Sequence, residues 1–140
     1  MTRILIPIDG SNNALRAVDY GVSVAEGCPA AEVHLLNIQE PVYEQVRDVM
    51  SKAEVEKMEI ATGHFILEPA KKILDDAGIA NVSEVRIGPI AAAIADYAKE
   101  KRCDNIIMGT RGQGSIKTMI MGSVTTKVIH LADVPVTLVK

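Results

Sequence analysis

Five short apolar segments alternate along the chain with longer segments of helical spacing, and this alternation constrains the fold more than any other feature. The five segments are Ile4–Ile8, Val33–Ile38, Val82–Ile87, Asn105–Met108 and Val134–Val139. Several are almost entirely apolar, which is typical of strands covered on both faces. Strands that alternate with helices form a mostly parallel sheet with right-handed crossovers. The sequence therefore predicts one α/β domain over residues 1–140, with helices on both faces of the sheet.

Four helices are predicted between these strands, at Asn12–Glu26, about Lys52–Ala77, Pro89–Lys101 and about Val124–Leu131. Ser11 stands where the N-cap of the first helix is expected, and Ser51 with Glu54 fits a capping box before the second. Proline suits the first position of a helix, which places Pro89 at the start of the third. Ser123 is the expected N-cap of the last helix.

The second helix and the segment before it carry three further expectations. Pro69 lies inside the helix, so we expect a kink or break near Glu68. Glu54, Glu56 and Glu59 alternate with lysines, and this pattern indicates a solvated helix face. The segment Gln39–Met50 lacks a clear period and is predicted to be a loop, long enough to be mobile or functional.

Composition excludes several classes of function. Aromatic residues make up 3% of the chain and there is no Trp, so the core is expected to be aliphatic. The net charge is −3, and no dense basic face with stacking aromatics is visible, so we expect no nucleic-acid partner. No apolar run approaches the ~18 residues of a membrane span, and we expect no membrane association. Cys28 and Cys103 lack a C-x-x-C pattern, which favours reduced thiols in a cytoplasmic protein.

A glycine-rich turn follows the fourth predicted strand. Gly109 and Gly112 allow the backbone to turn sharply and to approach a ligand closely. Ten residues after Gly112, the pair Gly122 and Ser123 opens the last helix, and a helix N-terminus suits phosphate. The hydroxyls of Ser123 and Thr125 can add hydrogen bonds. The alternative is that these glycines only satisfy the backbone geometry of the turn.

The end of the first strand offers a second candidate position. Ligands of open α/β sheets bind at the carboxyl ends of the strands, and Asp9 stands at such an end. Its carboxylate could contact a sugar hydroxyl, an amino group or a metal-bound water. The alternative is that Asp9 or Ser11 merely caps the first helix.

These segments together resemble the universal stress protein family, in its single-domain, ATP-binding branch. The motif of that branch is G-x2-G-x9-G-[ST], and Gly109, Gly112, Gly122 and Ser123 satisfy it. The resemblance covers essentially the whole chain through the further segments Ile6–Ser11, Val85–Ile90 and Val134–Val139.

The resemblance implies a Rossmann-like, five-stranded parallel sheet of order 3-2-1-4-5 and an ATP site. Adenine and ribose would lie near Pro7, Ile8, Asp9 and the backbone of Ile38. The ribose and α-phosphate would be bordered by Met108, Gly109, Arg111 and Gly112. The β- and γ-phosphates would be held by Gly122, Ser123, Val124 and Thr125. Mg²⁺ would be held mainly through phosphates and water, because the sequence offers no protein cage for it.

The resemblance also implies a homodimer and a regulatory role in stress response. Strand five, Val134–Val139, would be an apolar edge, and pairing with its copy would cover it. We therefore expect a nucleotide-dependent switch that acts on an unidentified protein partner. The alternatives are a slow ATPase, or a module that binds AMP or cyclic AMP. His34, His64 and His130 do not cluster, and no base or arginine finger is evident, so no catalytic residue is assigned.

Overall fold

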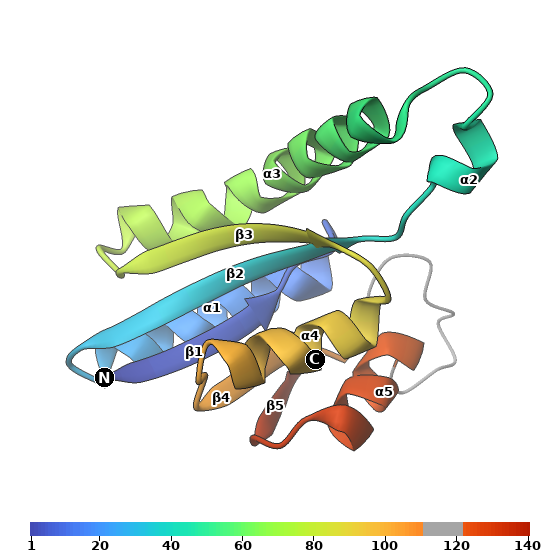
Figure 1. Ribbon diagram of the computed structural model, residues 1–140. Coiled ribbons are helices and arrows are strands. Elements are labelled where there is room, and N and C mark those ends of the chain that lie inside the picture. The colour runs from blue at the N-terminus through green and yellow to red at the C-terminus, as the bar shows by residue number, and fades with distance from the viewer. Residues whose placement is uncertain (111–121) are drawn as a thin grey trace.

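The computed structural model describes residues 1–110 and 122–140, and a five-stranded parallel sheet lies at its centre (Figure 1). Its strands are β1 (Thr2–Pro7), β2 (Ala31–Gln39), β3 (Asn81–Ile87), β4 (Asn105–Gly109) and β5 (Val136–Val139). They lie in the order β3-β2-β1-β4-β5, and each of the four pairings is parallel. The predicted fold class and strand order are confirmed.

Helices cover both faces of this sheet, as Figure 1 shows. The helices are α1 (Asn12–Glu26), α2 (Tyr43–Val46), α3 (Lys52–Asp76), α4 (Ile90–Glu100) and α5 (Ser123–Leu131). Along β1, Ile4 and Ile6 join the core under α1 and α3, whereas Leu5 joins the core under α4 and α5. This alternation explains why β1 is apolar from Ile4 to Ile6, where the strand is buried on both faces. None of the helices in the described ranges is long and apolar enough to cross a membrane.

The local capping signals predict the starts of α1 and α3 correctly and miss those of α4 and α5 by one residue. Ser11 Oγ accepts a hydrogen bond from the N–H of Ala14 at 3.1 Å. Ser51 and Glu54 form the predicted capping box. The prediction for Ser123 is wrong, because Gly122 is the N-cap and Ser123 is the first helical residue. In the same way Pro89 is the N-cap of α4, one residue before the first helical position.

Of the kink or break predicted near Glu68, the break is wrong, because α3 runs through Pro69 without interruption. A proline removes the N–H that would bond the carbonyl four residues earlier, which belongs here to Phe65. Phe65 is exposed, so water can satisfy that carbonyl. Leu67 and Leu74, on either side of Pro69, are fully buried against the sheet. Tertiary packing on both sides of the proline therefore keeps the helix continuous.

Two further expectations about this region are corrected. The face with Glu54, Glu56 and Glu59 is not uniformly solvated, because Glu59 is only 7% exposed. The segment from Gln39 to Met50 is not entirely a loop, since it contains the single turn of α2.

A buried polar network joins β2 to α4 on the face of the sheet that α4 and α5 cover. His34 Nε2 lies 2.7 Å from Glu32 Oε1, and His34 Nδ1 lies 2.7 Å from the Tyr97 hydroxyl. A carboxylate only accepts, so Nε2 of a neutral His34 carries the proton and Nδ1 accepts from the Tyr97 O–H. The guanidinium of Arg86 also stacks on Tyr97, with its Cζ 4.6 Å from the centre of the ring. Tyr97 thus joins α4 to the sheet, as does Glu100, whose carboxylate accepts two hydrogen bonds from Arg86 of β3.

Replacement of Tyr97 by Phe is expected to leave buried His34 Nδ1 without a partner. We expect Y97F to lower the free energy of unfolding by about 1–3 kcal/mol, measured by urea denaturation. The matched control is Y20F, because Tyr20 is 46% exposed and its hydroxyl can bond water. Equal stability of Y97F and Y20F would show that the network contributes nothing.

Candidate functional site

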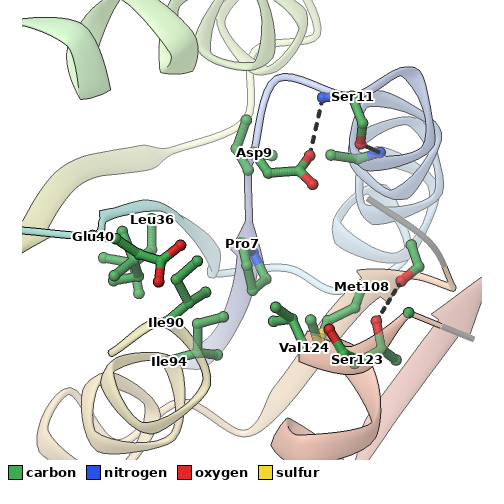
Figure 2. A pocket seen from close by; sticks show the side chains of 16 residues that line it. Pro7, Asp9, Ser11, Leu36, Glu40, Ile90, Ile94, Met108, Ser123 and Val124 are labelled. Atoms are coloured by element: carbon green, nitrogen blue, oxygen red, sulfur yellow. Dashed lines mark hydrogen bonds between the residues drawn. The ribbon is translucent and has the colours of Figure 1, made fainter. Parts of the chain in front are cut away.

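A cavity of about 300 Å³ opens at the carboxyl edge of the sheet, between the ends of β1, β2 and β4 and the helices α4 and α5 (Figure 2). Every site residue predicted from the sequence that the structure describes lines this cavity: Pro7, Ile8, Asp9, Ile38, Met108, Gly109, Gly122, Ser123, Val124 and Thr125. The two others, Arg111 and Gly112, lie outside the described residues. Residues more than 100 positions apart in the sequence therefore meet around one hollow.

Six further residues line the cavity and were missed by the sequence reasoning: Ser11, Ala14, Leu36, Glu40, Ile90 and Ile94. Glu40 directly follows β2, so the rule that ligands bind at strand carboxyl ends could have found it. Ile90 and Ile94 lie one turn apart on α4 and form an apolar wall. No local signal shows that α4 crosses this end of the sheet.

The turn after β1 is held by its own side chains. Asp9 Oδ1 accepts a hydrogen bond from the N–H of Ser11 at 3.0 Å, and Ser11 caps α1. Gly10 between them has a φ of 87°, a left-handed conformation that glycine adopts without strain. The capping alternative for Ser11 is therefore confirmed, while Asp9 both supports the turn and lines the cavity.

Hydrogen bonds tie the start of α5 to the end of β4. The N–H of Gly122 donates to the carbonyl of Thr110 at 2.6 Å. The Thr125 hydroxyl donates to the carbonyl of Gly109 at 3.1 Å, and Thr125 is buried. Because that hydroxyl proton is already engaged, Thr125 positions α5 against β4. The N-terminus of α5 is thereby directed at the cavity.

Gly109 has a packing role that the sequence did not reveal. A Cβ at this position would lie 2.1 Å from Oδ1 of Asn13 and 3.0 Å from its backbone oxygen. Asn13 is buried at the start of α1, and its Nδ2 donates to the carbonyl of Val139 at 3.4 Å. Glycine at this end of β4 therefore allows α1 to approach the sheet edge. This packing role differs both from ligand contact and from the turn geometry that the sequence offered as the alternative, and Gly109 also lines the cavity.

The two ends of the cavity differ in charge. At one end lies the N-terminus of α5, which carries a partial positive charge. At the other end, Figure 2 shows the Glu40 carboxylate beside Leu36 and Ile90. Among its described lining residues there is no Lys, Arg or His. An anionic group is therefore favoured at the α5 end and disfavoured near Glu40.

The most strongly shifted ionisable groups lie outside the cavity lining. Burial raises the pKa of Cys103 to about 11 and holds the pKa of Tyr97 well above its usual value. Neither residue lines the cavity, so both are neutral packing groups of the α4 core at pH 7. In the described part of the chain, no three His, Cys, Asp or Glu side chains are grouped so as to hold a metal ion.

Comparison with known proteins gives matches along the whole chain. The model of the Universal stress protein family matches residues 1–140. Universal stress protein MJ0531 of Methanocaldococcus jannaschii is 28% identical over 138 residues, which cover 99% of this chain and 81% of that protein.

Solved structures give matches with the same fold. The structure of MJ0577 from the same organism has a TM-score of 0.86 at 29% identity, over 99% of this chain and 95% of that chain. A universal stress protein in complex with cAMP has a TM-score of 0.71 at 21% identity, over 99% of this chain and 96% of that chain. At 21% identity the likeness concerns the fold alone.

The packing role of Gly109 can be tested without any ligand. We expect G109A to lower the free energy of unfolding by about 1–3 kcal/mol, because its Cβ would overlap Asn13. The control is G27A, where a Cβ would come no closer than 3.7 Å to its neighbours. Urea denaturation of both variants in nucleotide-free buffer gives the comparison. An unchanged unfolding midpoint in G109A would contradict the assigned role.

Proposed function

The chain belongs to the universal stress protein family, and from this premise we propose that its cavity binds ATP and that the protein is a nucleotide-dependent regulator. One observation carries the proposal: the N-terminus of α5 and an apolar slot formed by Leu36, Ile90 and Ile94 open into the same cavity. A nucleotide has the matching division into an anionic phosphate end and a flat, largely apolar base.

The phosphates would lie at the start of α5. Helix geometry leaves the N–H groups of Ser123, Val124 and Thr125 without an intrahelical acceptor. The N–H of Gly122 already donates to the carbonyl of Thr110. Gly122 therefore forms the bend after which the N–H groups of the next three residues are exposed. Backbone N–H groups at such a terminus are suitable donors for phosphate oxygens.

The base and ribose would occupy the other end of the cavity. Leu36 and Ile38, at the end of β2, face Ile90 and Ile94 of α4 and form a slot for a flat ring. The Glu40 carboxylate repels phosphate and can accept a hydrogen bond from an exocyclic amino group. Asp9 lies where a ribose hydroxyl could donate to it.

Mg²⁺ fits this site only as an ion held by the nucleotide. The described lining residues provide Asp9 and Glu40 as carboxylates, and no group of three ligands. Mg²⁺ commonly keeps several waters and binds through substrate phosphates. Such an ion would offset phosphate charge at a wall where the described residues include no basic side chain.

A smaller adenine nucleotide, AMP or cyclic AMP, is the second candidate ligand. The observation that favours it is the cavity volume of about 300 Å³, at the lower end of the range for small-molecule sites. Competition calorimetry with ATP, AMP and cyclic AMP would rank the three. The cytoplasmic location, the protein partner and weak ATP hydrolysis stay predictions.

We further propose a homodimer through β5. This strand lies at the edge of the sheet and pairs with β4 alone, while Leu138 is partly exposed on it. An apolar edge strand is covered most simply by a second copy. We expect analytical ultracentrifugation to give a dimer and L138E to shift it toward monomer. A monomer at all concentrations would exclude this assembly.

A charge placed at the start of α5 tests the nucleotide site. We expect isothermal calorimetry to show ATP binding, and S123D to weaken it by about tenfold or more, because the new carboxylate would face the phosphates. The control T126D adds the same charge to the same helix, at an exposed position outside the cavity lining.

Two results would contradict the proposal. Absence of ATP binding at millimolar concentration would refute it directly. Equal losses of affinity in S123D and T126D would show that the start of α5 is not the phosphate end.

A further inference from the structure

We propose that a second pocket, between α2, α3 and the end of β2, binds a small organic cation with an apolar chain, of the class of primary alkylamines. This pocket has a volume of about 250 Å³. It is separate from the nucleotide cavity, and within the described ranges Glu40 alone lines both. The inference does not depend on nucleotide binding.

The walls of this pocket are mainly apolar. They carry Val42, Val46, Met50, Val55 and Met58. Val42 and Met58 remain largely exposed, so apolar surface continues to the mouth of the pocket. Methionine side chains are flexible and adapt to ligands of different shape. An alkyl chain placed here would remove this surface from water.

One carboxyl group lies in the pocket wall with its hydrogen bonds incomplete. Glu59 is 7% exposed, and its Oε1 accepts from the N–H of Val42 at 3.4 Å. That distance exceeds the usual range of about 2.7–3.2 Å. Its Oε2 is buried and has no hydrogen-bond partner among the residues described. A buried carboxyl group with an unused acceptor is stabilised most by a charged donor beside it.

The charge of the lining selects a cation. Among the described residues that line it, Glu40 and Glu59 are ionisable, and none is Lys, Arg or His. An ammonium group supplies three donors, whereas an alcohol supplies one and a carboxylate supplies none. A primary amine therefore complements both the carboxyl groups and the apolar wall. A neutral ligand of the same length complements only the wall.

The two helices around the pocket differ in how firmly they are held. Gly63, one turn after Glu59, allows α3 to approach β3 so closely that a Cβ would lie 2.5 Å from Val85. α2 is a single turn of four residues without a side-chain cap. A ligand would thus bind against the firm wall of α3, which carries Glu59, with α2 as the adaptable wall.

Methionine methyl groups can test the proposal in the full chain, because the two cavities contain different methionines. We expect n-hexylamine, titrated at pH 7 into protein with ¹³C-methyl methionine, to shift the NMR signals of Met50 and Met58 and to saturate. Met108 in the nucleotide cavity is the internal reference. Hexanol should bind at least about tenfold more weakly, and hexanoate should not bind. ATP should shift Met108 instead, which separates this test from that of the proposed function.

Substitutions supply the matched controls. E59Q keeps the shape and removes the charge, and we expect it to weaken hexylamine binding by about tenfold or more. E68Q removes a carboxylate from an exposed position of the same helix and should leave binding unchanged. V46W fills the pocket from the side of α2, and we expect it to abolish binding. This variant replaces E59Q as the test if E59Q does not fold.

Three results would overturn the proposal. They are equal affinity for hexylamine and hexanol, unchanged binding in E59Q or V46W, and shifts at Met108 without shifts at Met50 and Met58.

Discussion

The close approach of α1 to the end of β4 is the contact on which the cavity proposed for the nucleotide depends. Gly109 leaves room for Asn13, and Asn13 donates to the carbonyl of Val139 at the end of β5. Thr110 directly follows Gly109, and its N–H also donates to the carbonyl of Val139. The carbonyl of Thr110 accepts a hydrogen bond from the N–H of Gly122. A continuous set of contacts thus runs from the start of α1 through the ends of β4 and β5 to the start of α5. The direction in which the N-terminus of α5 points therefore follows from packing within the protein.

The parts of the fold that depend on neighbouring residues were predictable from the sequence. α1 was predicted with correct ends, because Ser11 and the spacing of its apolar residues are local signals. The break at Pro69 was predicted wrongly, because the burial of Leu67 and Leu74 against the sheet outweighs the proline. Glu59 was assigned to a solvated face, and its burial depends on where α3 lies on the sheet. Sequence patterns do not contain that placement.

The residues of the candidate site likewise fall into those that the sequence could predict and those that depend on tertiary packing. Residues at the ends of β1 and β4 and at the start of α5 could be found, because motif spacing and the carboxyl-end rule identify them. Ile90, Ile94 and Glu40 form the opposite wall and were missed. Glu40 follows the end of β2, where the same rule could have found it. The position of Ile90 and Ile94 instead follows from the packing of α4, in which Tyr97 bonds His34 of β2 one turn beyond Ile94. The apolar wall is therefore a consequence of tertiary packing, which has no signature in the glycine motif.

Glu40 lines both cavities, and its carboxylate affects the charge of the ligand that each cavity favours. In the nucleotide cavity its carboxylate opposes the α5 N-terminus, so an anion is favoured only at the far end. In the pocket beside α3 the same carboxylate adds to Glu59, so a cation is favoured. A cation next to Glu40 would weaken the repulsion that this carboxylate exerts across the nucleotide cavity. Two ligands of opposite charge could thus bind at this edge of the sheet without competing, and each would reduce the electrostatic cost of the other.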